Sequence, residues 1–189
     1  MYHIKEDLRA VKSAEFLYEG LTRCMKNKDF DKISITDITK ESTVSRATFY
    51  RNFDTVIDIL YWKCDQLFKK VLTDYVTQEP KLDNPNNLIN YVFHFWVEHV
   101  DVLEILIKER RIDIIFNTFL NNADIAMRYI YDKLNIPELN YKYFISTRVG
   151  IFIGVFQTWI EEGKKESADE LVRIIEEQYR IIDITGFIF

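Results

Sequence analysis

Two helix-start signals stand close together near residue 40, and they constrain the fold more than any other feature of the chain. Ser34 followed by Asp37 has the spacing of a capping box, which predicts a short helix over 35–41. Ser45 is a second candidate N-cap and predicts another short helix over 46–53. Two short helices joined by a turn of about three or four residues form a helix-turn-helix.

Helical periodicity continues through the rest of the chain. Apolar residues recur at three- and four-residue steps over 5–28, and a long amphipathic helix is predicted over 55–77. A long apolar helix is predicted over 138–162, and a last helix over 167–183. Only five glycines and three prolines interrupt a sequence in which nearly half of the residues are apolar. This composition favours long helices around a large core over a many-turned β architecture. We therefore predict an all-α fold of about nine helices.

The predicted helices divide into a three-helix helix-turn-helix domain over 1–54 and a larger helical domain over 55–189. Residues 1–55 carry ten Lys/Arg against nine Asp/Glu, whereas the remaining 134 carry fifteen against twenty-one. The N-terminal third is therefore the relatively basic part of a chain whose net charge is −5. Many nucleic-acid-binding domains are far more basic, so charge alone does not decide what this part of the chain binds.

Composition also indicates the compartment. The two cysteines, Cys24 and Cys64, lie inside helical patterns without metal-ligand spacing, so we expect a reducing, cytoplasmic setting. The first residues have scattered charges and lack the apolar stretch of a signal peptide. The longest apolar run, VGIFIGVFQTWI, is shorter than the roughly 18 residues of a spanning helix and contains Gln157, so no membrane segment is expected.

Arginines and aromatic residues alternate in the second short helix of the predicted helix-turn-helix. Phe49 and Phe53, one turn apart, supply a face that packs onto a core. The opposite face offers side chains that suit the major groove of DNA: Arg46, Ala47, Thr48, Tyr50 and Arg51. Arginine pairs with guanine, methyl groups contact thymine, and hydroxyl and guanidinium groups bond to phosphates. The helix N-termini at Ser34 and Ser45 offer free backbone N–H groups to further phosphates.

The run ISITDITKESTVSRATFYRNFDTVIDIL, residues 33–60, resembles the DNA-binding signature of the TetR family of transcriptional repressors, and FYRNF is its most specific part. The later run GIFIGVFQTWIEEGKKESADELVRII is similar to the last two helices of many such regulators from low-GC Gram-positive bacteria. The resemblance implies a three-helix DNA-binding domain, a larger helical regulatory domain, and a homodimer that binds a palindromic operator in double-stranded DNA.

The resemblance also implies roles for particular residues. The positions at which family members read bases are occupied by Ser45, Arg46, Ala47 and Thr48. Tyr50 and Asn52 stand where members have tyrosine and histidine in contact with phosphates, and Thr36 stands near the DNA backbone.

Two residues depart from the family pattern. Members usually have glycine at the position of Thr43, in the turn between the short helices, and a β-branched residue is costly at positive φ. We therefore expect either another turn geometry or local strain. Members commonly have lysine at the position of Val56, and its loss should lower the affinity for DNA and flatten the salt dependence by about one unit of slope.

The segment 138–162 is apolar around almost its whole circumference, which requires cover on more than one side. Its two glycines, four residues apart, allow another backbone to approach closely. We expect a four-helix dimer interface from 138–162 and 167–183 of two subunits, with these contact residues: Gly150, Ile151, Gly154, Val155, Trp159, Leu171, Ile174 and Ile175. Such a dimer places the second short helix of each helix-turn-helix, the helix expected to enter the major groove, about 34–36 Å from its copy, which is one turn of DNA. In the alternative, the glycines pack only against helices of their own chain.

Aromatic and polar residues are concentrated over 86–134, which is consistent with a pocket for a small-molecule effector. Its candidate lining residues are Tyr91, Phe95, Trp96, His99, Phe116, Phe119 and Tyr129. An aromatic stripe at helical spacing is also typical of an ordinary core. His94 and Glu98 are one turn apart with Asp101 beyond, but no second histidine or carboxylate pair completes a metal site. We expect neither a metal nor another cofactor.

Our first hypothesis is a homodimeric transcriptional regulator, a repressor that leaves DNA when a small-molecule effector binds. The sequence has no nucleophile–base arrangement, phosphate-binding loop or Cys/His metal spacing, so an enzyme is not expected. The alternative hypothesis is a helical protein-interaction module or co-regulator of the same fold, which acts on a protein partner rather than on DNA. In that case the two capped helices belong to an ordinary core, and their Arg and Tyr side chains extend into solvent.

Overall fold

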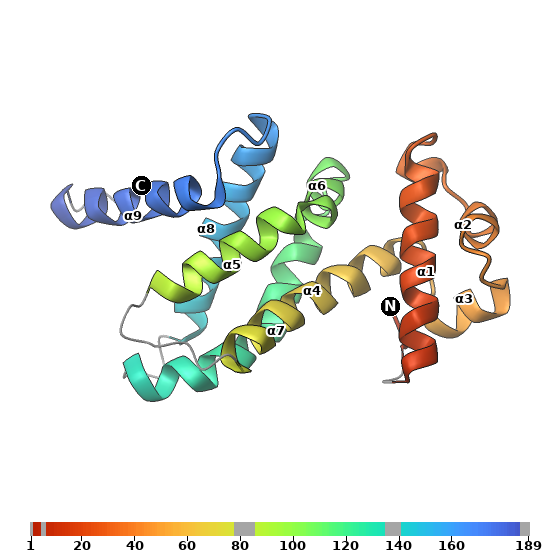
Figure 1. The fold of residues 1–189 in the computed structure, drawn as a ribbon, viewed down its shortest axis with the longest axis horizontal. Helices are drawn as coiled ribbons and strands as arrows, with labels where there is room; N and C mark the ends of the chain where they lie inside the picture. The colour runs from red at the N-terminus through yellow and green to blue at the C-terminus, as the bar shows by residue number, and fades with distance from the viewer. Residues whose placement is uncertain (1, 5–6, 78–85, 135–140, 186–189) are drawn as a thin grey trace. The chain divides into compact units, whose positions relative to one another are not determined.

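The computed structural model describes residues 2–4, 7–77, 86–134 and 141–185 (Figure 1). Within this part of the chain it contains one 3-10 helix (Phe30–Lys32), one isolated β-bridge and nine α-helices. The α-helices are α1 (Leu8–Met25), α2 (Ile35–Ser42), α3 (Arg46–Asn52), α4 (Ile57–Thr77), α5 (Asn86–Glu98), α6 (Val100–Lys108), α7 (Ile112–Leu134), α8 (Tyr141–Glu161) and α9 (Ala168–Thr185). The predicted all-α fold is confirmed.

The chain divides into two compact units, Met1–Gln66 and Leu67–Phe189, and the division falls within α4. The first unit contains α1, α2, α3 and the first half of α4. The second unit contains the remaining half of α4 and the helices that follow it. The domain boundary that we predict from the sequence, after residue 54, lies before α4 and stays a prediction.

In the first unit, α2 approaches α1 very closely at Gly20 of α1. A Cβ atom on Gly20 would lie 2.8 Å from the Cβ atom of Ser42 and 2.9 Å from the carbonyl oxygen of Ile38. Both distances are shorter than the van der Waals contacts that Cβ atoms make with non-bonded carbon or oxygen atoms. Glycine is therefore required here because of the close approach of two backbones.

The helix α3 is attached to the rest of the first unit by two phenylalanines. Phe49 and Phe53 have no accessible surface, and their ring centroids are 5.9 Å apart. The ring of Phe53 also meets the edge of Trp62 of α4 at 6.2 Å. Leu17 of α1 and Ile38 of α2 are completely buried in the same unit. Burial of one such side chain contributes about 1.5–3 kcal/mol, so this core holds a helix that is only two turns long.

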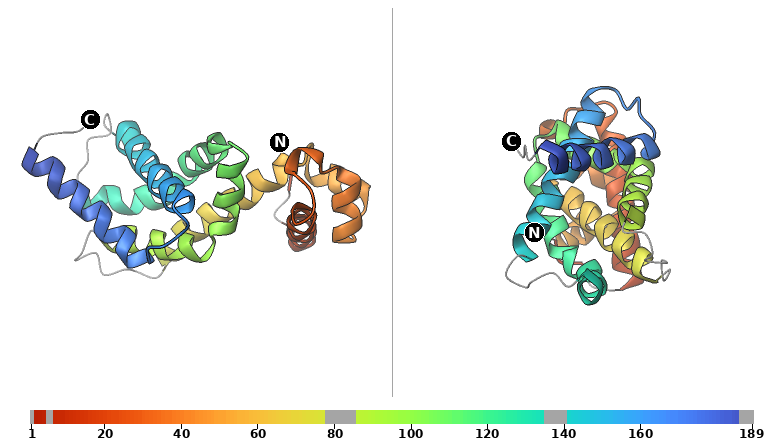
Figure 2. Two further views of the ribbon diagram at one scale, coloured as in Figure 1. Left: turned by 90° about the horizontal axis from the view of Figure 1, so that it is seen from above. Right: turned by 90° about the vertical axis from the view of Figure 1, so that its left-hand side faces the viewer.

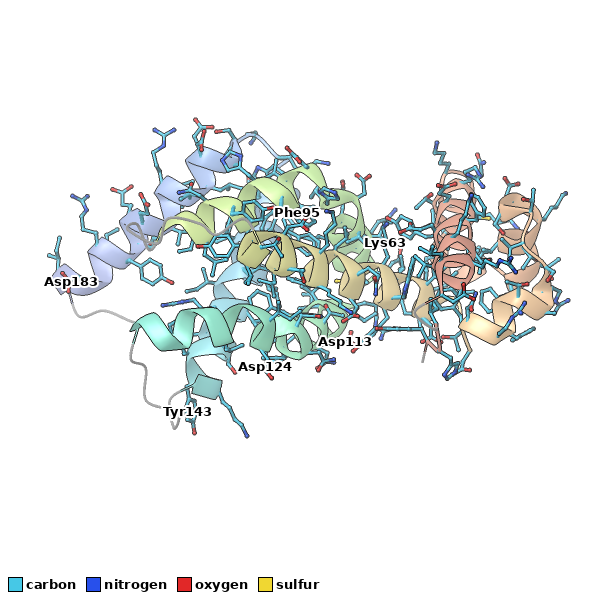
Figure 3. The ribbon with its side chains drawn as sticks, turned by 60° about the horizontal axis from the view of Figure 1, so that its bottom comes forward. Lys63, Phe95, Asp113, Asp124, Tyr143 and Asp183 are labelled. Atoms are coloured by element: carbon cyan, nitrogen blue, oxygen red, sulfur yellow. The ribbon has the colours of Figure 1, made fainter. Side chains whose placement is uncertain are left out.

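A partly buried ion pair joins α1 to the first half of α4 through Lys63, which is labelled in Figure 3. The Lys63 ammonium donates to the two carboxylate oxygens of Glu15 at 3.0 and 2.8 Å, and it lies 5.1 Å above the ring centroid of Tyr18. These contacts fix α4 against α1 within the first unit.

An aromatic cluster forms the core of the second unit, in which α5 packs beside α9 and α7 beside α8 (Figure 2). The ring of Phe68 in α4 lies 4.5 Å from Trp96 of α5. It also lies 5.2 Å from Phe119 of α7 and 5.5 Å from Phe152 of α8. We call these four residues the aromatic cluster. It connects four helices through one set of ring contacts.

The helix α8 has a buried face and an open face. Val149, Phe152 and Phe156 are buried, whereas Gly150 and Gly154 are exposed and a Cβ atom on either would meet nothing within 4 Å. By length and composition, the stretch 142–161 could cross a membrane, with a mean hydropathy of 1.2. A single helix of this kind is weak evidence for a membrane segment, because core helices of soluble proteins have the same composition.

We expect Gly20→Ala to lower the free energy of unfolding by about 1–2 kcal/mol, since the cost of overpacking exceeds the helix-propensity gain. Urea unfolding followed by circular dichroism measures this change. The control is Gly150→Ala on α8, where the added methyl group has open space and the propensity gain is unopposed within the chain. A Gly20→Ala protein as stable as the wild type would contradict the close contact between α1 and α2.

Candidate nucleic-acid interface

The helix α2 begins with the capping box that the sequence predicts. The Ser34 hydroxyl accepts a hydrogen bond from the Asp37 N–H at 3.2 Å. In return, the Asp37 carboxylate accepts from the Ser34 N–H at 2.9 Å and from its hydroxyl at 2.7 Å. The Lys28 ammonium donates to the other oxygen of Asp37 at 2.7 Å. The hydrogen bond from Lys28, and after it those from Ser34, lower the pKa of Asp37 well below its usual range.

The turn between α2 and α3 contains a threonine in the left-handed region. Thr43 has φ 58° and ψ 16°, a conformation that glycine adopts without steric cost. The Ser42 hydroxyl accepts from the Val44 N–H at 3.3 Å, and Arg23 donates to the carbonyl oxygen of Glu41 at 2.7 Å. Of the two outcomes that we expected, the structure has the strained one. The strain costs about 1–2 kcal/mol, and the surrounding contacts hold it in place.

Three polar side chains, at the N-cap of α3 and along its length, are connected by hydrogen bonds. The Ser45 hydroxyl accepts from the Thr48 N–H at 3.1 Å, and the two hydroxyl oxygens lie 3.0 Å apart. The Arg51 guanidinium donates to the Thr48 hydroxyl at 3.0 Å. We call Ser45, Thr48 and Arg51 the polar row. These bonds order the side chains in advance, which lowers the entropic cost of binding a rigid partner.

The structure places eight of the nine predicted DNA-binding residues at the surface. Seven are exposed: Ser34, Thr36, Ser45, Arg46, Ala47, Tyr50 and Arg51. Thr48 is half-buried. Tyr50 is 51% exposed, and its ring rests at right angles on Phe49 with centroids 5.5 Å apart, which holds the phenol at the surface. Within the described residues, Arg46 has no acidic partner, so its guanidinium is available to an external anion.

Asn52 does not lie where the family resemblance implies. It is only 3% exposed, and its side-chain N–H group has no hydrogen-bond acceptor among the residues that the structure describes. Asn52 follows Phe49 by three residues, so helical geometry turns it toward the core with that phenylalanine. The prediction that Asn52 contacts a phosphate is therefore corrected, because its side chain is buried and does not lie on the exposed face of α3.

At the start of α4, the Asp58 carboxylate accepts hydrogen bonds from the residues that precede the helix, and Val56 stands where a cation would be expected. Asp58, only 8% exposed, accepts from the N–H groups of Asp54 and Thr55 at 3.2 and 2.8 Å, and from the Thr55 hydroxyl at 2.9 Å. Val56, at the position where members commonly have lysine, is half-buried. This part of the surface therefore lacks the cation that the family pattern would supply.

Two residues that contact α3 were not predicted from the sequence. Tyr2 forms a β-bridge with Phe53, and the His3 N–H donates to the carbonyl oxygen of Asn52 at 2.8 Å. These contacts join segments about fifty residues apart in the chain, and no local pattern signals them.

The predicted effector-pocket residues separate into several groups. Trp96 and Phe119 belong to the aromatic cluster. Phe95 stacks on His99 with a centroid distance of 4.2 Å, and the His99 ring also hydrogen-bonds the carbonyl oxygen of Phe95 at 2.8 Å. Tyr91 is half-buried. The structure thus gives these residues packing roles in a core, and the effector pocket stays a prediction.

One of these residues has an unusual polar group. Trp96 is fully buried, yet its indole N–H has no acceptor among the described residues. An unpaired buried donor costs about 1–3 kcal/mol, so this group is a candidate anchor for an acceptor atom of an effector. Phe116 is half-buried, and the side chain of Tyr129 lies outside the residues that the structure describes.

A groove of about 270 Å³ lies between α8 and α9 on the open face of α8. It is lined by Ile151, Gly154, Val155, Ile174, Ile175, Gln178 and Tyr179, and five of these are predicted dimer contacts. Gly150 is exposed one turn from Gly154. Trp159 and Leu171 are buried instead, and the Trp159 indole donates to the carbonyl oxygen of Glu166 at 2.9 Å. These two residues belong to the core rather than to the groove.

An arginine adjoins this groove through one of its lining residues. The Arg148 guanidinium donates to the Tyr179 hydroxyl at 2.6 Å, and it lies 4.5 Å from the ring centroid of Phe144.

His94, which we considered as a metal ligand, is paired with Asp169 at 2.9 Å. No three His, Cys, Asp or Glu side chains in the described part of the chain form a group that could hold a metal.

These features define a class of all-α proteins in which a helix-turn-helix precedes a larger helical unit. Residues 83–179, about half of the chain, match the TetR-type family described as "Transcriptional regulator C-terminal region". The chain therefore belongs to the TetR family of transcriptional regulators, as the sequence resemblance predicts. This membership points to a regulatory protein rather than an enzyme.

The fold is also similar to that of a solved structure. The crystal structure of Lin0861 from Listeria innocua, at 2.8 Å, matches with a TM-score of 0.80. The match covers 95% of this chain and 96% of that chain at 19% sequence identity, so it shows likeness of fold alone. No curated protein matches this sequence.

We expect Thr43→Gly to raise the free energy of unfolding by up to about 1 kcal/mol, because glycine adopts positive φ without steric cost. Chemical denaturation measures the change. Lys40→Gly is the matched control: it places glycine within α2, where the residue costs about 1 kcal/mol. A loss of stability in Thr43→Gly would show that the turn is not strained.

Proposed function

We propose that this protein is a cytoplasmic repressor that binds a palindromic operator in double-stranded DNA as a homodimer, with α3 in the major groove. The observation that carries the proposal is the division of α3 into two faces. Phe49 anchors the helix in the core, while Arg46, Tyr50 and Arg51 are exposed on its outer side. A helix that enters the major groove needs this combination of an anchored face and a polar face.

The chemistry of the exposed face favours DNA over a protein partner. Arg46 has no acidic partner within the described residues and suits the acceptor atoms of guanine. The phenol of Tyr50 suits phosphate oxygens, whereas the Ser34 hydroxyl already donates to Asp37 in the capping box. The polar row presents its donors with little remaining freedom, which suits a partner with a regular array of acceptors.

The homodimer in this proposal uses the groove between α8 and α9. Gly150 and Gly154 leave open space on α8, and the groove beside them has apolar walls. Ile174 and Ile181 of α9 are 43% and 41% exposed, which is unusual for large apolar side chains. A second copy that covers this face would bury both features and place two recognition helices on successive turns of DNA.

The proposal also includes release of the protein from DNA when a small-molecule effector binds. An effector that binds the second unit changes DNA affinity only if it favours one conformation of the dimer over another. The buried indole N–H of Trp96 offers such a ligand a hydrogen bond that the described residues do not supply. The helix α4 contributes to both compact units, so a displacement of α4 is the simplest connection between them.

An electrophoretic mobility shift with DNA that flanks the protein's own gene tests the main proposal. We expect Arg46→Ala to weaken binding about tenfold or more, since a guanine–arginine pair contributes about 1–3 kcal/mol. Tyr50→Ala should weaken binding to all sequences and leave the salt slope nearly unchanged, because a neutral phenol displaces no counterion.

The control variant is Lys165→Ala, which removes the same charge from an exposed position after α8 and should change the affinity by less than about twofold. If no flanking DNA binds, or if the protein associates with another protein in a salt-independent way, the alternative of a protein-interaction module is supported instead.

Sedimentation equilibrium tests the dimer. We expect Gly154→Leu to raise the dimer dissociation constant at least about tenfold, because its side chain would fill the groove that the second copy occupies. The fold should be kept, since a Cβ atom at this position meets nothing within 4 Å among the residues that the structure describes. Lys165→Leu adds the same apolar group outside the groove and should leave dimerisation unchanged. A wild-type dissociation constant for Gly154→Leu would refute this interface.

A further inference from the structure

Residues 2–4 run alongside the C-terminal end of the recognition helix and contact it through the backbone. Tyr2 forms an antiparallel bridge with Phe53, and the His3 N–H donates to the carbonyl oxygen of Asn52 at 2.8 Å. Asn52 is the last residue of α3. The final carbonyl groups of a helix have no partner within the helix, so His3 satisfies one that would otherwise depend on water.

The same segment is bound to α4 by a side chain. The Tyr2 hydroxyl donates to the Asp65 carboxylate at 2.7 Å, and its ring lies 5.9 Å from that of Tyr61. Burial, and after it the hydrogen bond to Asp65, raise the pKa of Tyr2, so the phenol stays protonated as the donor. Tyr2 therefore connects the end of α3 with a residue more than two turns into α4.

A side-chain pair adds a weaker link on the outside. The His3 ring lies 2.9 Å from the Asp54 carboxylate, between side chains that are each about half exposed. Exposed pairs of this kind contribute little to stability. The backbone bond of His3 and the hydroxyl bond of Tyr2 are therefore the stronger contacts of this segment.

We propose that residues 2–4 form a strap that holds the recognition helix in register with α4, and that Tyr2 is its positioning residue. Tyr2 acts on DNA binding through Phe53 and α3, without a contact to DNA of its own. A helix with seven residues has few internal hydrogen bonds, so its direction depends on contacts at its ends. The strap fixes the end that the Ser45 cap does not reach. This inference rests on the proposed function, because it concerns how well α3 fits DNA.

The test compares Tyr2→Phe with Tyr50→Phe in the full-length protein. Each variant removes one hydroxyl group, the first from the strap and the second from the exposed face of α3. Amide hydrogen exchange at residues 49–53 and binding to DNA flanking the gene are measured on both. For Tyr2→Phe we expect about tenfold faster exchange and about three- to tenfold weaker DNA binding, with an unchanged salt slope. For Tyr50→Phe we expect weaker binding with wild-type exchange.

Two further variants identify the contact. His3→Ala removes the exposed pair with Asp54 but keeps the backbone donor, so exchange and affinity should stay within about twofold of the wild type. Asp65→Ala combined with Tyr2→Phe should be less harmful than the sum of the two single changes, because both remove the same hydrogen bond.

Wild-type exchange at 49–53 in Tyr2→Phe overturns the strap, and wild-type DNA affinity overturns its positioning role. Weaker DNA binding with wild-type exchange, the pattern expected of Tyr50→Phe, also overturns it, since this marks a direct contact with DNA. If the wild-type protein binds no flanking DNA, the proposed function fails, and the exchange rates and the Asp65 cycle alone decide whether the strap exists.

Discussion

The helix α3 is too short to be stable by itself, and the contacts of the first unit compensate for this. The helix α3 has seven residues, whereas isolated helices shorter than about 12–15 residues are marginal in water. The buried rings of Phe49 and Phe53 fix its inner face, and the Ser45 hydroxyl closes its N-terminus. The His3 N–H closes the opposite end. Because all three attachments lie elsewhere, the outer face is free to carry the polar residues of the proposed DNA contact.

Several cations and anions of the first unit neutralise each other locally, so its net charge is a poor guide to function. Lys28 pairs with Asp37 at 2.7 Å, and Lys32 pairs with Asp29 at the same distance. These pairs stabilise caps and turns and contribute little to the long-range field. Arg46 stands apart from them on α3. A binding partner therefore contacts the side chains on the exposed face of α3 rather than the net charge of the unit. A nearly neutral domain can still place cations on that face.

Local features of the site could be predicted from the sequence, and non-local ones could not. The caps at Ser34 and Ser45 depend on residues three positions away, so their spacing was sufficient. Asn52 was assigned from family position, although its spacing from Phe49 already indicated a buried face. The bond between Tyr2 and Asp65 joins residues 63 positions apart, and periodicity carries no signal for such a pair. For Thr43 the sequence indicated a conflict between residue type and turn, but only the backbone angles could decide how the conflict is resolved.

The composition of α8 has a physical reason in the two surfaces that it serves. Its inner face packs into the aromatic cluster through Phe152, and its outer face borders an apolar groove. In a two-fold dimer a surface meets its own copy, so a hollow and a protrusion must occur on the same face. Here Gly154 lines the hollow, and Ile174 of α9, which borders the same groove, is 43% exposed. An apolar helix with small residues on one side is therefore what the proposed homodimer requires, and the same two-fold symmetry requires a palindromic operator.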